Sequence, residues 1–225
     1  MCGIVAYIGK QPAFPVILKG LKRLEYRGYD SSGIALFGEN VCTFKKKGRV
    51  AELEAWNEEI ISEATVGIGH TRWATHGEPS DANAHPHSSN SGRLTLVHNG
   101  IIENYASLKQ ELVQKGYTFK SETDTEVLVN FIEDIQINNN SSLEEAMRIA
   151  LKRVVGAYVI IVMEEGFPNR LIAARKGSPL VIGVGEGEHF LASDASPIIE
   201  YTKKVIYVND YELAIISPDE IILKN

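Results

Sequence analysis

The chain has 225 residues, of which 44% are hydrophobic and 23% are charged, and its formal net charge is −6. This balance is that of a globular protein with one sizeable core or two small ones. The negative charge argues against non-specific binding of nucleic acid, and the basic cluster at Lys45–Lys47 is short enough for a solvated strand end.

The two cysteines, Cys2 and Cys42, provide no disulfide framework and fit a reducing compartment. No apolar run approaches the ~20 residues that span a bilayer. The apolar N-terminus is interrupted at Gly9, which argues against a signal peptide. We therefore expect a soluble cytoplasmic protein without a membrane partner.

The first nine residues predict a short apolar strand with Cys2 at its start. If Met1 is removed, Cys2 carries a thiol with a pKa of about 8.5 beside an α-amine of about 7.7–8.0. Such an amine can take the thiol proton and return it to a leaving group. A retained Met1 would turn this amine into a non-basic amide. The residues alone are equally compatible with a small hydrophobic side chain at a fraying terminus.

In chain order, Pro12 and Pro15 open a helix with a buried stripe that includes Ile17 and Leu21. A polar, glycine-bracketed loop at 27–33 is of the kind that carries function. The pattern then predicts strands at Ile34–Phe37 and Val41–Lys46, an amphipathic helix from Val50 to Ser62, and a strand at Val66–Trp73.

The run from Ala74 to Gly92 is long for an unstructured loop in a compact domain and is typical of a functional lid. A strand at Leu94–Val97 follows and ends in His98-Asn99-Gly100. The next helix carries Leu108 and Leu112 on one face and stops at Gly116.

Two capping boxes, Thr123 with Glu126 and Ser142 with Glu145, start two further helices. From Gly156 onward, closely spaced short strands favour an antiparallel sheet. We expect these strands at 158–163, 171–174, 180–184, 190–193, 205–208, 213–216 and 221–223. Helices and strands are partly segregated and no linker is visible, so we expect one α+β domain over residues 1–225 with helices outside the sheets.

Several blocks resemble the glutaminase domain of glucosamine-6-phosphate synthase, a class II glutamine amidotransferase of the N-terminal-nucleophile hydrolase type. The resemblance covers nearly the whole chain in order, and its blocks are Met1–Val5, Leu24–Gly33, Gly69–Gly77, His98–Asn104, Ser121–Glu126, Ala174–Leu180 and Ala192–Asp194. It implies a four-layer αββα sandwich of two antiparallel sheets. It also implies hydrolysis of L-glutamine to glutamate and ammonia through a γ-glutamyl thioester on Cys2.

Attack of Cys2 on an amide places negative charge on the former carbonyl oxygen, which requires donors already aimed at it. Asn99 and Gly100 can supply a side-chain N–H and a backbone N–H, and the resemblance assigns both to an oxyanion hole. Without the other blocks, Asn-Gly would favour an ordinary hairpin turn.

Free glutamine also presents an α-carboxylate and an α-ammonium. Arg72 suits the carboxylate because a guanidinium can bind it through two hydrogen bonds, and Asp124 suits the ammonium. The resemblance implies both roles, although an acid such as Asp124 in a first helical turn is favoured by the helix dipole without any ligand.

The resemblance further implies that Thr75 and His76 close over glutamine, that Trp73 gates ammonia and that Arg27 supports the loop at the nucleophile. We expect no metal, since His76, His85 and His87 have no partners at ligand spacing, and no cofactor.

The resemblance implies a sugar-phosphate isomerase domain, which binds fructose 6-phosphate, and a dimeric full-length enzyme; residues 1–225 do not include that domain. The nearest alternatives are the glutaminase of amidophosphoribosyltransferase or of asparagine synthetase, against which the 26–33 and 72–77 blocks speak. A non-catalytic glutamine-binding module is the alternative of another class.

Overall fold

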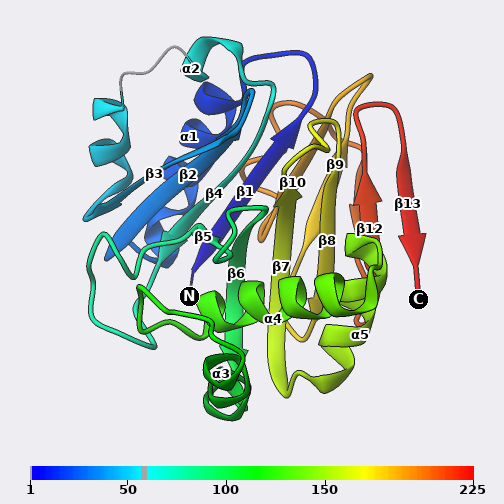
Figure 1. Cartoon of the computed structure of the whole chain (residues 1–225). Helices are drawn as coiled ribbons and strands as arrows, with labels where there is room; N and C mark the ends of the chain where they lie inside the picture. Colours follow the sequence, from blue (N-terminus) through cyan, green and yellow to red (C-terminus); the bar gives the residue numbers. More distant parts are fainter. Residues whose placement is uncertain (1, 57–59) are drawn as a thin grey trace.

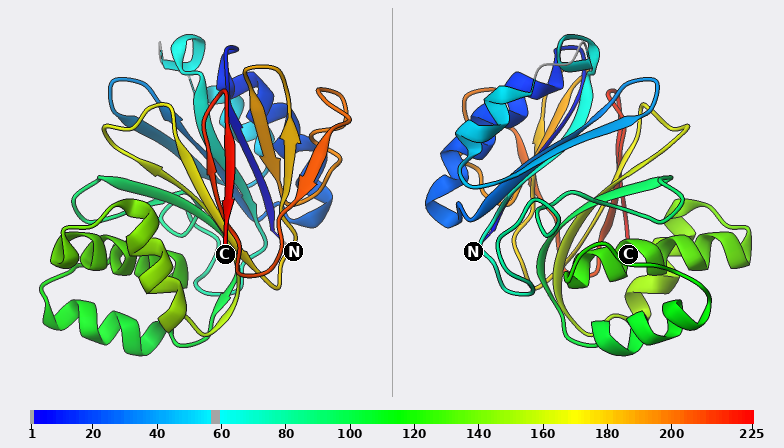
Figure 2. Two further views of the ribbon diagram at one scale, coloured as in Figure 1. Left: turned by 90° about the vertical axis from the view of Figure 1, so that its right-hand side faces the viewer. Right: turned by 60° about the vertical axis from the view of Figure 1, so that its left-hand side comes forward.

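A computed structural model describes residues 2–56 and 60–225. Two antiparallel sheets lie face to face, and helices cover the outer face of each (Figure 1). Figure 2 shows the same four layers from two other sides. The predicted α+β sandwich with helices outside two antiparallel sheets is therefore confirmed.

The first sheet has seven strands, in the order β11-β9-β10-β1-β4-β2-β3. The strand β1 lies at its centre, paired with β10 on one side and β4 on the other. The bounds are β1 Gly3–Ile8, β2 Ser31–Phe37, β3 Val41–Lys47, β4 Val66–Arg72, β9 Val181–Val184, β10 His189–Ala192 and β11 Val205–Tyr207.

The second sheet has six strands, in the order β13-β12-β8-β7-β6-β5. Its longest strands, β6 and β7, pair over nine positions from Leu94 opposite Glu164 to Ile102 opposite Gly156. The bounds are β5 His87–Ser88, β6 Leu94–Ile102, β7 Gly156–Glu164, β8 Leu171–Lys176, β12 Leu213–Ile216 and β13 Ile221–Lys224.

The helix α1 packs on the seven-stranded sheet, while α3, α4 and α5 pack on the six-stranded sheet. The α-helices are α1 Ala13–Leu24, α2 Ile60–Glu63, α3 Tyr105–Gln114, α4 Asp124–Asn139 and α5 Leu143–Arg153; the 3-10 helices are η1 Glu25–Arg27 and η2 Val50–Ala55. Among the described residues, no helix is long and apolar enough to cross a membrane.

A core between the two sheets holds their inner faces together. Ile4 and Ile68 from one sheet and Val97 and Ile161 from the other are completely buried in it. Burying each such side chain contributes roughly 1.5–3 kcal/mol, so this layer fixes the distance between β1 and β6. These two strands carry Cys2, at the start of one, and Asn99.

Both predicted helix caps are present. The Thr123 hydroxyl accepts a hydrogen bond from the backbone N–H of Glu126 at 3.2 Å, and Ser142 does the same for Glu145 at 3.3 Å. The Glu126 carboxylate, however, accepts from the N–H groups of Lys120 and Ser121, so the first box is not the reciprocal one that the pattern predicts. These contacts fix the point at which α4 begins.

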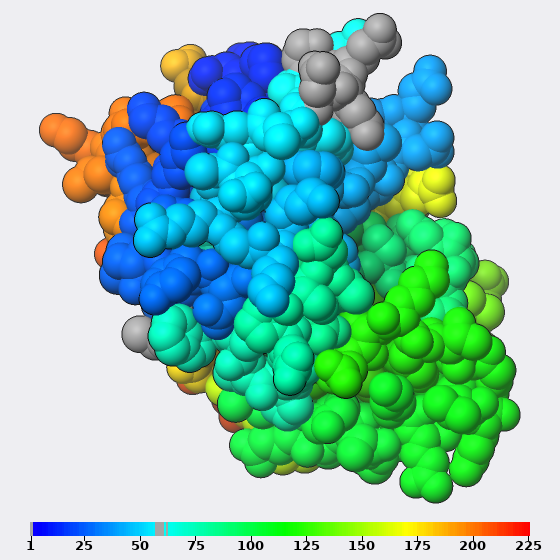
Figure 3. Space-filling view, turned by 90° about the vertical axis from the view of Figure 1, so that its left-hand side faces the viewer, coloured from blue at the N-terminus to red at the C-terminus, as the bar shows by residue number. Residues whose placement is uncertain are grey.

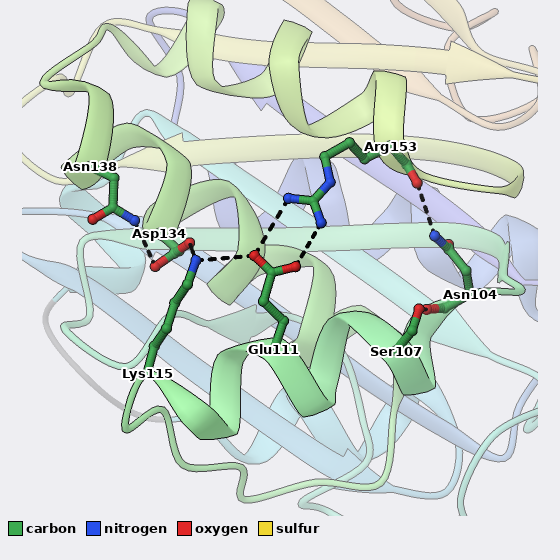
Figure 4. Close-up of polar contacts among 7 residues, drawn as sticks. All are labelled: Asn104, Ser107, Glu111, Lys115, Asp134, Asn138 and Arg153. Atoms are coloured by element: carbon green, nitrogen blue, oxygen red, sulfur yellow. Dashed lines mark hydrogen bonds and ion pairs between the residues drawn. The ribbon is translucent and has the colours of Figure 1, made fainter.

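An ion-pair network joins the three helices on the six-stranded sheet (Figure 4). Glu111 of α3 binds Arg153 of α5 at 2.6 Å, and Lys115 binds both Glu111 and Asp134 of α4. The Asn104 amide donates to the carbonyl oxygen of Arg153 at 2.9 Å. The network holds α4 against its neighbours and so supports the position of its first turn.

Three predicted elements differ from the structure in kind or by more than two residues at one end. The helix predicted from Val50 to Ser62 is wrong: the described part is a 3-10 helix over Val50–Ala55 and a short helix over Ile60–Glu63, and residues 57–59 lie outside the described residues. The strand predicted to begin at Ile34 begins at Ser31. The strand predicted to end at Val97 continues to Ile102, because β7 pairs with it along its whole length.

The predicted loop from Ala74 to Gly92 is only partly a surface loop. The side chains of Asn83, His85 and His87 are buried, and β5 lies within this stretch. In Figure 3 the teal surface of this stretch lies between the blue and cyan N-terminal segments and the green helices. Residues 83–87 of this stretch are therefore part of the core, whereas residues 74–82 are partly or fully exposed and are the part that could act as a lid.

Candidate active site

Cys2 lies at the start of β1 against the end of β4. Its Sγ accepts a hydrogen bond from the backbone N–H of Trp73 at 3.3 Å and lies 3.6 Å from the Trp73 carbonyl oxygen. Burial raises the pKa of the Cys2 thiol, although the Trp73 N–H and the charge of Arg72 lower it. A thiol in this setting needs a base to become a nucleophile. The predicted removal of Met1, which would expose that base, concerns a position outside the described residues.

Asn99 reaches Cys2 from the opposite sheet. Its Nδ2 donates to the carbonyl oxygen of Cys2 at 3.2 Å, and its Oδ1 lies 3.0 Å from Nε2 of His70. An amide nitrogen carries two hydrogens. A second N–H of Asn99 is therefore left beside the Cys2 backbone, where a developing oxyanion could accept it.

Asn99-Gly100 is not a hairpin turn, so that alternative interpretation is wrong. The pair lies inside β6, with Asn99 opposite Val159 and Gly100 opposite Tyr158. Gly100 has a φ of 131°, and a Cβ there would lie 2.0 Å from the carbonyl oxygen of Ala157. Glycine is required because β7 approaches so closely.

Arg72 ends β4, and its guanidinium is almost completely buried. Its Nη2 donates to the carbonyl oxygens of His76 and Gly77, the latter at 3.1 Å. Within the part of the chain that the structure describes, its buried Nη1 makes no hydrogen bond. The side chain therefore holds the first half of the 74–82 loop while keeping one donor for another acceptor.

Asp124 is the first residue of α4 and is also buried. Its Oδ2 accepts the backbone N–H of Ile102 at 2.8 Å. The carboxylate is thus used for more than its favourable position at a helix N-terminus, because it ties α4 to β6.

The loop residues predicted to cover the substrate lie beside these groups. Trp73 is 49% exposed and its ring meets that of Tyr29 edge-on, with 6.1 Å between centroids. His76 is half-buried and meets the ring of Tyr105 edge-on at 5.0 Å, while Thr75 is exposed. A half-exposed indole next to a thiol is consistent with a movable element.

Arg27 is connected to the start of β1, next to Cys2, through Ser193. Its Nη1 donates to the carbonyl oxygen of Ser193 at 3.1 Å and lies 3.6 Å from a carboxylate oxygen of Asp194. The Ser193 hydroxyl in turn accepts the N–H of Ile4 at 3.0 Å. Arg27 therefore supports the start of β1.

Most of these side chains line one small cavity. Its lining includes Cys2, Arg72, Trp73, Thr75, His85, His98, Gly100, Thr123, Asp124 and Thr125. Its volume of about 10 Å³ is close to that of a single water position. This volume is too small for an amino acid, so the site would have to open before it could bind one.

Comparison with known proteins identifies the family of this chain. Residues 54–216 match the model of the glutamine amidotransferase domain family. The chain belongs to this family. Of its curated relatives, the glutamine–fructose-6-phosphate aminotransferase of Bacteroides thetaiotaomicron is 58% identical over 96% of this chain, and that of Chlorobaculum tepidum is 54% identical over all of it.

The chain spans only 36% and 37% of the length of these two relatives. Among solved structures, a glutamine phosphoribosylpyrophosphate amidotransferase from B. subtilis superposes with a TM-score of 0.85 over 99% of this chain and 49% of its own, at 27% identity. The present chain is thus much more similar in sequence to these two aminotransferases than to the B. subtilis amidotransferase. The glutaminase of an amidophosphoribosyltransferase was one of the nearest alternatives.

The sequence predicted no role for His70, although this residue lies in the block Gly69–Gly77. In this amidotransferase domain His70 is completely buried and contacts Asn99 directly. Its signal was a polar residue in the middle of the strand Val66–Arg72, where both faces are buried. His85 and His87 lie in the same buried cluster, and among the described residues no three side chains form a metal-binding group.

Proposed function

We propose that this chain hydrolyses the side-chain amide of L-glutamine to give glutamate and ammonia, with Cys2 as the nucleophile. The observation that carries the proposal is convergence: Cys2, Arg72 and Asp124 line one cavity, and the Asn99 amide donates to the backbone of Cys2, although these residues come from both sheets and from α4. Membership of the glutamine amidotransferase domain family supports it.

In the proposed reaction the α-amine of Cys2 takes the thiol proton, and Sγ attacks the δ-carbon of glutamine. Nδ2 of Asn99 and the N–H of Gly100 would stabilise the resulting oxyanion. The amine returns the proton to the leaving nitrogen, the C–N bond breaks, and ammonia leaves a γ-glutamyl thioester. Water then attacks the thioester, which releases glutamate and regenerates the thiol.

Recognition in the proposal uses opposite charges. Arg72, which has a free donor, binds the α-carboxylate of glutamine, and Asp124 binds the α-ammonium. Thr75 and His76 close over the bound substrate, Trp73 gates the ammonia, and Arg27 maintains the start of β1. Displacement of the His76 and Gly77 carbonyls from Arg72 would couple carboxylate binding to loop movement.

The wider role in the proposal is the glutaminase step of glucosamine 6-phosphate synthesis from fructose 6-phosphate and glutamine, in the cytoplasm. Its partner would be a sugar-phosphate isomerase domain in a dimeric full-length enzyme, with residues 1–225 as one glutaminase domain. The names of the relatives support this role. In the test, the 225-residue chain alone should release glutamate and ammonia in equal amounts, and only protein that also carries the isomerase domain should yield the amino sugar.

The test of the chemistry is a Cys2→Ala variant with Cys42→Ala as its control, since Cys42 is partly buried on β3 and lies outside the cavity. Cys2→Ala should abolish glutamate release and Cys42→Ala should leave it unchanged. A glutamine-analogue diazo-ketone should add its mass to Cys2. An intact mass shows whether Met1 is removed. Labelling at Cys42 in place of Cys2 would contradict the proposal, as would full activity of a chain that retains Met1.

A further inference from the structure

His70 occupies a fixed place behind the proposed oxyanion hole. It lies in β4, is completely buried, and its Nε2 is 3.0 Å from the carbonyl oxygen of His98 and 3.0 Å from Oδ1 of Asn99. The ring stacks on His85, with 4.1 Å between centroids and 25° between planes. These contacts leave the imidazole little freedom to turn.

The carbonyl oxygen of His98 settles which ring nitrogen of His70 carries the proton. A backbone carbonyl can only accept, so Nε2 must be the N–H. The Asn99 atom at the same distance must then also be an acceptor, which is the amide oxygen. Its amide nitrogen is left to face the carbonyl oxygen of Cys2 at 3.2 Å.

The opposite orientation of Asn99 would lose both contacts at once. Turning the amide by 180° would place its NH₂ against the N–H of His70 and its oxygen against the carbonyl oxygen of Cys2. Both pairs would repel. The donor state of His70 thus selects the amide orientation in which Nδ2 points to Cys2.

Burial keeps His70 in the neutral form that this arrangement uses. Desolvation lowers its pKa to about 3, against the hydrogen bonds to Asn99 and His98, which raise it, and the charges of His98 and Arg72 lower it further. His85 helps indirectly, because its Nδ1 accepts the backbone N–H of His98 at 3.4 Å and so holds the carbonyl that His70 contacts.

We propose that His70 is a positioning residue for catalysis: its Nε2–H fixes the side-chain amide of Asn99 so that Nδ2 faces the oxyanion formed on attack by Cys2. The proposal deepens the function proposed above and depends on it. His70 itself touches neither the substrate nor Cys2 in this scheme, and its effect on the reaction passes entirely through Asn99.

The kinetic test compares His70→Met, which removes the donor, with His70→Gln, whose side-chain amide can donate from nearly the same place. Loss of one oxyanion donor lowers kcat by roughly 10²–10³-fold. We expect His70→Met to lower kcat about 30–100-fold, with KM changed less than about threefold since Arg72 and Asp124 are intact, and His70→Gln to recover at least about tenfold of the loss.

The matched control is His189→Met. His189 is also a buried histidine in the seven-stranded sheet, where it lies on β10 opposite Ile8 and Val184. It should leave kcat within about twofold. A kcat for His70→Met close to that of the parent would overturn the proposal, as would an equal loss in His189→Met or a change confined to KM.

A second measurement does not depend on activity or on a variant that folds. Long-range ¹⁵N–¹H correlation spectra of histidine-labelled protein report the tautomer of each neutral ring. We expect His70 as the Nε2–H tautomer between about pH 6 and 8, and an Nδ1–H tautomer would overturn the proposal. Absence of glutamine hydrolysis in the parent protein would instead refute the proposed function and leave the spectrum unaffected, so the two failures are distinguishable.

Discussion

The carboxylate of Asp124 accepts the backbone N–H of Ile102 at 2.8 Å, which ties the first residue of α4 to the strand that carries Asn99 and Gly100. The proposed ammonium ligand is therefore hydrogen-bonded to the strand that provides the proposed oxyanion hole. Changes at the start of α4 should affect binding and chemistry in ways that separate a structural role from a recognition role.

Asp124→Asn and Arg72→Ala should each raise the KM for glutamine about tenfold to a hundredfold. Loss of a charge-assisted hydrogen bond in a closed site costs roughly 1.5–3 kcal/mol. Asn can still accept from Ile102 through its amide oxygen, so the melting temperature of Asp124→Asn should fall little. Steady-state kinetics and thermal melts check both, with Asp219→Asn, exposed between β12 and β13, as control. A large loss of melting temperature at unchanged KM would favour the purely helix-stabilising role.

The two helix caps offer a matched pair. Thr123→Ala and Ser142→Ala each remove a hydroxyl that accepts a helix N–H, which typically costs about 1 kcal/mol of unfolding free energy. Thr123 also contacts Nε2 of His87 at 3.1 Å and precedes Asp124. We expect the larger loss of unfolding free energy in Thr123→Ala, since it also breaks the buried contact with His87, and a raised KM only in that variant. An equal effect of Ser142→Ala on KM would show that cap loss acts globally.

Gly100→Ala should be far more damaging than Gly116→Ala. Both glycines have positive φ, 131° and 92°, but a Cβ at Gly116 meets nothing within 4 Å, whereas at Gly100 it meets the backbone of β7. We expect a loss of about 1–2 kcal/mol at Gly116 from backbone strain. At Gly100 a further 1–3 kcal/mol or so should come from overpacking, along with most of the activity. Equal losses of unfolding free energy in the two variants, measured in urea, would contradict the close approach of β7 to Gly100.

The buried histidines should make the protein sensitive to acid. Desolvation lowers the pKa of His70 to about 3 and holds those of His85 and His87 well below 6.5. Because the unfolded chain binds these protons first, this stability is complete above about pH 6.5 and is lost as the pH falls below it. Each histidine can contribute up to about 1.4 kcal/mol per pH unit.

The measurement is the unfolding free energy in urea at about pH 7, 6 and 5. His87→Gln, which can keep a hydrogen bond to Thr123, should flatten the decline relative to the parent, since it removes one group that must take up a proton on unfolding. Parallel curves for parent and variant would show that His87 is not kept neutral by the fold.

Apolar spacing and capping residues are local signals, so the pattern predicted an α+β domain with helices outside the sheets and the two helix caps, while the four-layer sandwich was implied by the family resemblance. The prediction was wrong for elements whose bounds depend on pairing with strands far away in the sequence. The strand through Asn99 and Gly100 continues to Ile102 only because β7 lies beside it, and an isolated Asn-Gly would turn. The burial of His85 could not be predicted for the same reason. The polar composition of residues 74–92 does not indicate that part of this stretch packs into the core. The roles of Cys2, Arg72 and Asp124 remain predictions.

The central position of β1 has a consequence for how activity is lost. Its six residues are buried and paired with β4, and Val5–Ile8 are also paired with β10, so the amides of β1 should exchange with solvent only on global unfolding, whereas residues 74–82 should open locally. The proposed nucleophile is thus attached to a strand that should be among the most protected, and the proposed lid is one of the segments that should be least protected. Mild denaturant should therefore abolish glutamine capture while the sheet that holds Cys2 is still intact.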